Sequence, residues 1–164
     1  GERGGIQVNA YLQTSDPDIY ALGDAAEIQH LITHKPAMIP LAGPANKQGR
    51  IAADNIVYGN KEVYKGAMGT SIAKIFDLTV AAAGANAKLL KREGIPYISS
   101  YTHGSSHAGY YPGAVPLSIK ILFAPETGVL LGAQVVGFGG VDKRIEMLAQ
   151  TIQHEGTILS LIHI

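Results

Sequence analysis

The chain has 164 residues, of which 46% are hydrophobic and 16% are charged, and its formal net charge is zero. This length suits one domain or slightly more, and the hydrophobic content is sufficient for a buried core. Neutrality gives no electrostatic basis for binding nucleic acid or an anionic membrane surface, so we expect neither partner.

The chain has no cysteine, which excludes disulfides and thiolate metal sites within these residues. No apolar run reaches the roughly 20 residues that span a bilayer, and no basic-then-apolar start indicates secretion. We therefore expect a cytoplasmic location. The first residue is not Met, and residues 1–5 are rich in glycine. Both features indicate a fragment of a longer protein.

The first predicted elements are two short strands, residues 6–9 and 19–22, separated by a turn that contains Asp-Pro. The second strand ends in Gly23, which allows the backbone to turn, and Asp24, which places a carboxylate beyond the strand. Ligands of open α/β sheets bind at such strand ends. A carboxylate there can accept two hydrogen bonds from the hydroxyls of a sugar-like chain. An Asp that merely ends a strand or caps a helix is the alternative.

Residues 25–40 read as an irregular connector, and residues 41–58 as a helix. Proline at position 44 fits only the first turn of such a helix. Its apolar stripe is expected to comprise Ile51, Ala52, Asn55 and Ile56. The first backbone N–H groups lack partners within the helix and favour negative charge ahead of it. A helix simply packed against a sheet is the alternative.

The pattern after residue 65 predicts a second, α+β block with an antiparallel sheet and flanking helices. Residues 117–123 alternate as a half-buried strand with the odd positions inward. The stripe Ile145, Leu148 (or Met147) and Ile152 should face the sheet from a helix. The predicted strands are 70–76, 78–84, 96–101, 117–123 and 129–137, and the predicted helices are 86–93 and 142–155.

The last six residues, 159–164, fit nothing before them, because a helix stop at Gly156 precedes them. They can be written as the codons CTG TCT CTT ATA CAC ATC, which resemble a transposon end used in sequencing libraries. We expect a non-native tail here. An apolar C-terminal strand is the alternative.

Tyr110 and Tyr111 are the most suggestive chemical groups in the second block. Their hydroxyls stay neutral at pH 7 and can donate a hydrogen bond to a thiolate or an oxyanion. Packing at an interface is the alternative, since aromatic residues are enriched there. His103 and His107 have metal-compatible spacing only in a helix, which Gly104 disfavours, so we expect no metal site. Lys143 and Arg144 could meet a phosphate, but a solvated or salt-bridged first turn is favoured.

Three stretches resemble the pyridine nucleotide-disulfide oxidoreductases. Thr14 to Asp24 resembles the second flavin-binding motif of that family. The sequences Gly132 to Gly137 and Gly140 to Ile145 resemble its dimerisation domain. The likeness is strongest to the branch of coenzyme A-disulfide reductases, NADH oxidases and persulfide reductases. It implies the end of an FAD-binding α/β domain in residues 1–64 and a dimerisation domain in residues 65–158.

The resemblance also implies roles for particular residues. Asp24, after Gly23, would hold the ribityl chain of FAD, and backbone groups of Leu41 and Ala42 would face the pyrimidine edge of the flavin. Tyr110, with Tyr111 second, would reach across a homodimer toward the partner's redox cysteine. The implied parent is a redox flavoprotein that transfers electrons from NAD(P)H through FAD to a small-molecule disulfide and serves cell redox homeostasis.

Two other functions remain open. One is an NADH oxidase or peroxidase. The other is an inactive dimerisation module, since these residues contain one predicted ribityl contact and one helix end but no Gly-x-Gly-x-x-Gly loop and no redox thiol. We expect the isolated chain neither to retain FAD nor to oxidise NADH.

Overall fold

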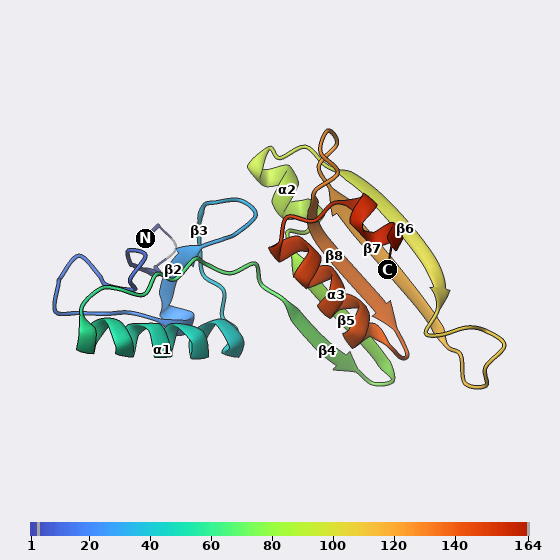
Figure 1. Cartoon of the computed structure of the whole chain (residues 1–164), viewed down its shortest axis with the longest axis horizontal. Coiled ribbons are helices and arrows are strands. Elements are labelled where there is room, and N and C mark those ends of the chain that lie inside the picture. Colours follow the sequence, from blue (N-terminus) through green and yellow to red (C-terminus); the bar gives the residue numbers. More distant parts are fainter. Residues whose placement is uncertain (3, 164) are drawn as a thin grey trace. The chain divides into compact units, whose positions relative to one another are not determined.

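The computed structural model describes residues 1–2 and 4–163. These residues form two compact units, Gly1–Met68 (unit 1) and Gly69–Ile164 (unit 2), which Figure 1 shows in sequence colours. Both units contain helices and strands, which confirms the predicted α+β class. None of the helices within the described ranges combines the length and the apolar character that a membrane span needs.

Unit 1 contains a small mixed sheet and one long helix. The sheet has the order β1-β2-β3, with β1 parallel to β2 and β2 antiparallel to β3. The strand expected over residues 6–9 is confirmed as β1, and β2 is its partner. The elements are β1 (Ile6–Gln7), the 3₁₀ helix η1 (Gly23–Ala25), β2 (Ala26–Gln29), β3 (Pro36–Ala37) and α1 (Ala42–Tyr58).

The strand predicted over residues 19–22 is wrong. Tyr20 makes only an isolated bridge to Gln13, and the next strand, β2, begins after the Gly-Asp pair. The physical reason is local bonding: the Ile19 N–H donates to the carbonyl of Asp16, and the Ala21 N–H donates to that of Leu12. Asp24 therefore precedes a strand. The predicted irregular connector, residues 25–40, is also wrong in part, because it contains β2 and β3.

The helix predicted over residues 41–58 is confirmed as α1. Its buried face differs from the prediction: it consists of Gln48, Ala52 and Asn55, whereas Ile56 is 61% exposed. The core beneath α1 is small, and its buried members are Leu12, Ile28, Ala52 and Tyr64. Two of the three buried positions on α1 are amides, so polar contacts replace apolar ones there.

Asn55 binds two separate segments to the C-terminal half of α1. Its carbonyl oxygen accepts from the backbone N–H groups of Lys61 and Glu62, at 3.0 and 2.8 Å. Its amide nitrogen donates to the backbone carbonyls of Tyr11 and Glu62, at 3.1 and 2.8 Å. One buried side chain thus satisfies four backbone groups that have no strand partner.

Unit 2 is a five-stranded sheet in the order β4-β5-β8-β7-β6, with every neighbouring pair antiparallel. All five predicted strands and both predicted helices are present, and β6 extends to Ser105. The elements are β4 (Ser71–Ile75), β5 (Leu78–Gly84), α2 (Ala87–Glu93), β6 (Ile98–Ser105), β7 (Pro116–Phe123), β8 (Leu130–Gly137), α3 (Val141–Gln153) and the 3₁₀ helix η2 (Ile158–His163).

Helix α3 packs against β5 and β8, across one face of this sheet (Figure 1). The predicted stripe Ile145, Leu148 and Ile152 is confirmed as its buried face. The sheet side of the contact consists of small residues, which allow the helix to approach closely. They are Ala81 and Ala83 on β5 and Ala133 and Val135 on β8.

The inward pattern of β7 differs in one respect from the prediction. Leu117 is buried as expected, but Leu122, an even position, is only 1% exposed. The ladder shifts register between Leu122 and Phe123. The chain at Ala85 closely approaches Gly132, the pair partner of Leu122, and a Cβ at Gly132 would clash with it. The chain at Ala85 therefore covers β8 at Gly132, next to Leu122.

The C-terminal residues form η2, and the alternative of an apolar strand over 159–164 is wrong. Residue 164 lies outside the described residues, and a non-native origin of this tail stays a prediction. The segment before it joins the sheet, because the Leu130 N–H donates to the carbonyl of Gly156 and the Ile158 N–H to that of Gly128.

We predict that Asn55→Leu lowers the free energy of unfolding of unit 1 by about 2–4 kcal/mol, because four hydrogen bonds to partly buried backbone groups are lost. Native-state hydrogen exchange of the α1 amides measures this free energy. Asp54→Ala, at the exposed neighbouring position, is the control and should change it by less than about 0.5 kcal/mol. Equal effects of the two changes would contradict a stabilising role of the Asn55 hydrogen bonds.

Candidate functional site

The Gly23–Asp24 turn occupies a single 3₁₀ turn just before β2. Gly23 has a φ of 71°, a left-handed conformation that a residue with a Cβ rarely adopts. The requirement for glycine at this turn is thereby confirmed. The side chain of Asp24 is exposed, so its carboxylate is accessible to a ligand.

The N-terminus of α1 is the second part of the site. Leu41 precedes the helix in an extended conformation and provides no side-chain cap. Pro44 has no N–H, and the Ala45 N–H donates to the carbonyl of Leu41. Of the two predicted backbone donors, the Leu41 N–H is already bonded to the carbonyl of Ile39, so this part of the prediction is wrong for its N–H. The N–H groups of Ala42 and Gly43 are the donors at the helix start, and the helix dipole favours negative charge in front of them.

The structure brings these two predicted parts together. Helix α1 packs against η1, and a Cβ built on Gly23 would lie 3.7 Å from the Cβ of Ala45. The Gly23 N–H donates to Oε1 of Gln48 at 2.7 Å. Gly23 and Asp24 thus lie against the first two turns of the helix that begins at Ala42. An exposed carboxylate and a helix N-terminus together form a surface with both hydrogen-bond acceptors and donors.

Gln48 is a residue of this region that sequence reasoning missed. Its side chain is only 1% exposed. Burial raises the pKa of the Tyr64 hydroxyl above its usual value, and the polar side chain of Gln48 partly offsets this rise. The available signal was the spacing of positions 48, 52 and 55, which share one helix face.

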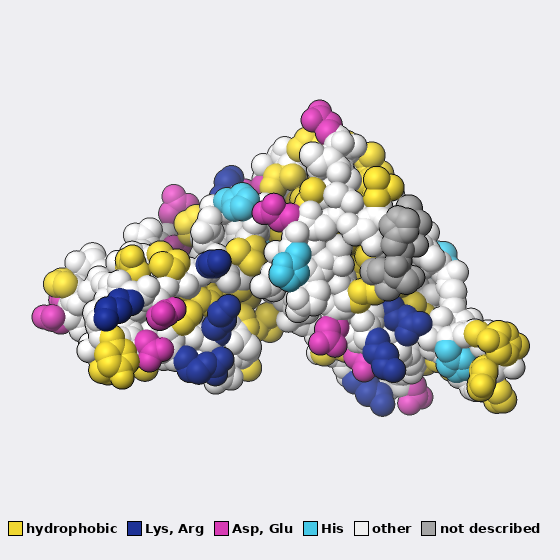
Figure 2. Space-filling model, in the orientation of Figure 1, with side chains coloured by type: hydrophobic (Ala, Val, Ile, Leu, Met, Phe, Trp, Pro, Cys, Tyr) yellow, Lys and Arg dark blue, Asp and Glu magenta, His cyan; other side chains and the backbone are white. Residues whose placement is uncertain are grey.

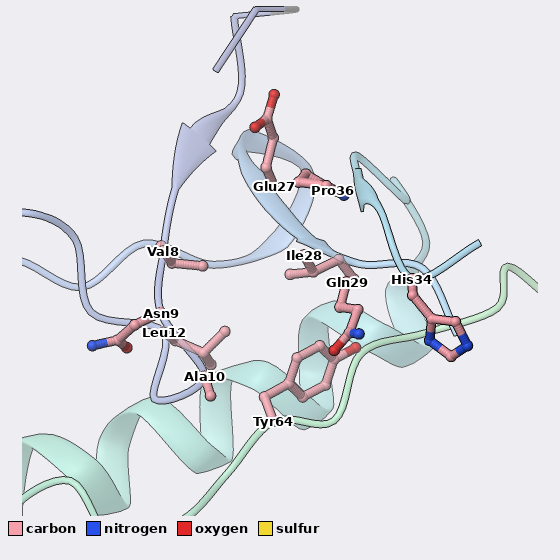
Figure 3. A pocket seen from close by; sticks show the side chains of 10 residues that line it. All are labelled: Val8, Asn9, Ala10, Leu12, Glu27, Ile28, Gln29, His34, Pro36 and Tyr64. Carbon is pink, nitrogen blue, oxygen red and sulfur yellow. The ribbon is translucent and has the colours of Figure 1, made fainter. Parts of the chain in front are cut away.

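Unit 1 also has a pocket of about 290 Å³ that contains none of the predicted site residues. Figure 3 shows Gln29 and Tyr64 pointing toward one another, whereas Asn9, Glu27 and His34 lie apart around it. The polar side chains therefore do not converge on one point. Within residues 1–2 and 4–163, no three His, Cys, Asp or Glu side chains gather in a way that could hold a metal ion.

Tyr110 and Tyr111 lie at the tip of the loop between β6 and β7, where Figure 2 shows hydrophobic side chains gathered. Tyr110 is 86% exposed and Tyr111 is 64% exposed. Their ring centroids are 5.5 Å apart, and His107 packs edge-on against Tyr111. Both hydroxyls are therefore free of the core of unit 2 and can reach a partner molecule.

The base of this loop is held by Arg144 from the first turn of α3. Its Nη2 donates to the carbonyl of Ser106 at 2.6 Å, and its Nη1 to that of Gly140 at 3.4 Å. The Ser106 N–H and the Val115 carbonyl close the loop at 2.9 Å. Lys143 is exposed, as expected for a solvated first turn, whereas Arg144 is half-buried and binds backbone carbonyls, which is neither solvation nor a salt bridge.

His103 lies on strand β6, which confirms that no helix places it beside His107. Its Nδ1 is 2.8 Å from Oγ of Ser118 on the neighbouring strand. Beside this pair, the Lys120 ammonium lies 5.2 Å from the ring centroid of Tyr101. Both pairs are on the sheet face opposite α3, where they line one edge.

Comparison with known proteins identifies the class. Residues 70–163 match the pyridine nucleotide-disulphide oxidoreductase dimerisation domain, and residues 1–49 match the pyridine nucleotide-disulphide oxidoreductase domain. The chain therefore belongs to the pyridine nucleotide-disulphide oxidoreductase family, as its motifs predicted.

Three proteins illustrate which members of the family this chain is similar to. A coenzyme A disulfide reductase of Staphylococcus epidermidis is 35% identical over 157 residues, which are 96% of this chain and 35% of that protein. The crystal structure of reduced Bacillus anthracis CoADR-RHD is 51% identical with a TM-score of 0.95, over 100% of this chain and 29% of that one. The water-forming NADH oxidase of Lactobacillus brevis is 28% identical with a TM-score of 0.90, over 96% and 35%. The chain thus spans about a third of the length of these relatives.

We predict that Arg144→Ala loosens the base of the loop between β6 and β7, residues 106–115, which we call the tyrosine loop. Loss of hydrogen bonds from a charged donor should speed amide exchange at Ser106 and Val115 by about tenfold or more. Hydrogen exchange followed by NMR measures both amides. Lys143→Ala, one position earlier, is the control and should leave them unchanged; equal exchange in the two variants would contradict the anchoring role.

Proposed function

We propose that this chain is the C-terminal part of a homodimeric flavoprotein that transfers electrons from NAD(P)H through FAD to a disulfide-type substrate, such as coenzyme A disulfide or a persulfide. The observation that carries the proposal is the exposed Asp24 carboxylate held beside the uncapped N-terminus of α1. Unit 1 then corresponds to the end of the FAD-binding domain and unit 2 to the dimerisation domain, with a cytoplasmic location.

The residues on this surface fit the chemistry of FAD. The Asp24 carboxylate would accept hydrogen bonds from the hydroxyls of the ribityl chain, which a sugar-like polyol offers in pairs. The N–H groups of Ala42 and Gly43, together with the helix dipole, would stabilise the negative charge of a reduced flavin. The chemistry that bound FAD would supply is electron transfer between NAD(P)H and the substrate.

The tyrosine loop supports a disulfide-type substrate. A neutral Tyr110 or Tyr111 hydroxyl can donate a hydrogen bond to a thiolate without ionising itself. Both rings extend from unit 2 on a loop that Arg144 fixes at its base. We assign the supporting role to Tyr110, which is the more exposed, and place Tyr111 second. The similarity to coenzyme A disulfide reductase favours the same substrate class.

The second candidate is an NADH oxidase, favoured by the similarity to the Lactobacillus brevis enzyme. In that case Asp24 and α1 keep their flavin roles, and the tyrosines serve packing. A catalytically inactive dimerisation module is the reading for the isolated chain. Disulfide reduction and dioxygen consumption by the full-length protein distinguish the two enzymatic functions.

We infer that the dimer interface is formed by the sheet face opposite α3, which is turned away from the viewer in Figure 1. Two rows of residues cross all five strands on this face, and none is buried. The first row is Ala73, Val80, Val136, Ser118 and His103. The second row is Ser71, Ala82, Gln134, Lys120 and Tyr101. An open sheet face of this mixed character suits a second copy of the same chain, because a two-fold axis pairs it with itself.

We predict that Asp24→Ala in the full-length protein weakens FAD binding by about tenfold or more, because charge-assisted hydrogen bonds to the ribityl chain are lost. Flavin content after purification and the dissociation constant of FAD from the apoprotein measure the change. Asp54→Ala, an exposed carboxylate on the body of α1, is the control. Wild-type flavin affinity in Asp24→Ala would refute the assignment.

We predict that Val136→Asp weakens self-association of the chain by about a hundredfold or more, because a carboxylate would be buried without a partner. Light scattering and sedimentation at micromolar concentration give the mass. Ala53→Asp, an exposed position on α1, tests for a general effect of added charge. A dimer that persists in Val136→Asp would place the interface elsewhere.

A further inference from the structure

We propose that Gln48 is a positioning residue for the flavin surface, by which we mean the Asp24 carboxylate and the N–H groups of Ala42 and Gly43. Its buried side chain holds the Gly23–Asp24 turn at a fixed distance from the N-terminus of α1. This inference rests on the proposed function, because it concerns the geometry of the proposed FAD contacts. It adds a residue that does not touch the cofactor. Gln48 acts through the backbone of Gly23.

The first step of the argument is the position of Gln48. It lies about two turns after Ala42, on the face of α1 that packs against η1. Its Oε1 accepts the N–H of Gly23 at 2.7 Å, and the residue after Gly23 is Asp24. One side chain therefore links the element that carries the carboxylate to the helix that carries the free N–H groups.

The second step is that the Gln48 side chain is enclosed. It is only 1% exposed and lies on the face of α1 that carries the buried Ala52 and Asn55. Turning the amide away from Gly23 would break a hydrogen bond in a site that water does not reach, which is costly. The Gly23 N–H therefore has one fixed acceptor.

The third step concerns the backbone of the turn. Gly23 is in a left-handed conformation, and the 3₁₀ helix has only three residues and no side-chain cap. The Gly23 carbonyl accepts the N–H of Ala26, and the Gly23 N–H donates to Gln48, so Gln48 supplies the side-chain partner that ties the turn to α1. Glycine accepts many backbone angles, and this hydrogen bond restricts them, which lowers the ordering cost of presenting Asp24 to a ligand.

Asn55 provides a matched control on the same helix. It is also an amide that is 1% exposed, and it lies seven residues after Gln48 on the same face. Its partners are Tyr11, Lys61 and Glu62, none of which belongs to the flavin surface. The loss of either amide removes buried hydrogen bonds, but only the loss of Gln48 frees the turn that carries Asp24.

The test compares Gln48→Leu, Gln48→Asn, Asn55→Leu and Asp24→Ala in the full-length protein. We expect Gln48→Leu to raise the dissociation constant of FAD about tenfold, as for loss of a partly buried hydrogen bond. Gln48→Asn, whose amide lies one methylene group farther from Gly23, should raise it as well. Asn55→Leu should lower the melting temperature and leave flavin affinity within about twofold of wild type, since its partners lie off the flavin surface.

A second readout does not depend on the cofactor. In this chain without FAD, amide exchange measured by NMR at Gly23 should accelerate in Gln48→Leu and not in Asn55→Leu. If Gln48→Leu does not fold, Gln48→Asn, whose shorter side chain keeps the amide but draws it away from Gly23, provides the test, and unchanged exchange and flavin affinity in it overturn the proposal.

The outcomes separate this inference from the proposed function. If Asp24→Ala weakens FAD binding and Gln48→Leu does not, the positioning role is wrong and the flavin surface stands. If neither variant affects FAD, the flavin surface itself is wrong. If Gln48→Leu and Asn55→Leu weaken FAD binding equally, the effect is one of general stability, which also overturns the positioning role.

Discussion

The buried face of α1 is the constraint on which unit 1 depends. A helix of 17 residues lies over a sheet with only short strands, so regular ladders satisfy few of the surrounding backbone groups. Gln48 and Asn55 supply the missing partners, one in each half of the helix. A buried amide is stabilising only when its polar atoms are paired, and an unpaired backbone group in the interior is costly. The two buried amides therefore provide hydrogen-bond partners for the irregular segments, and the irregular segments provide partners for the amides.

This arrangement connects stability to the proposed chemistry. The hydrogen bond that pairs the Gly23 N–H also fixes the residue before Asp24 against the helix whose N-terminus carries free donors. Asp24 needs no partner of its own within the unit and stays exposed. A ligand that carries both hydroxyls and a delocalised negative charge can engage the carboxylate and the helix start together.

Unit 2 obeys a different constraint, since its stability comes from a complete antiparallel sheet with α3 on one face. Small residues such as Ala81 and Ala133 allow close approach of the helix, which buries its apolar stripe. The other face mixes apolar side chains such as Val80 and Val136 with His103, Ser118, Lys120 and Tyr101. A face of this kind is stable in water and still offers a second copy of the chain a broad surface.

The family could be recognised from short motifs in the sequence. The α+β class, the five strands and two helices of unit 2 and the extent of α1 could also be predicted, because hydrophobic periodicity and Gly or Asn end signals are local properties of the chain. The strand order around Asp24 and the burial of Leu122 could not be predicted, since both depend on contacts between distant segments. The buried face of α1 was also decided by tertiary structure. Ile56 looks apolar and Gln48 polar in any local pattern, but backbone groups from residues 11, 23 and 61–62 require amide partners there.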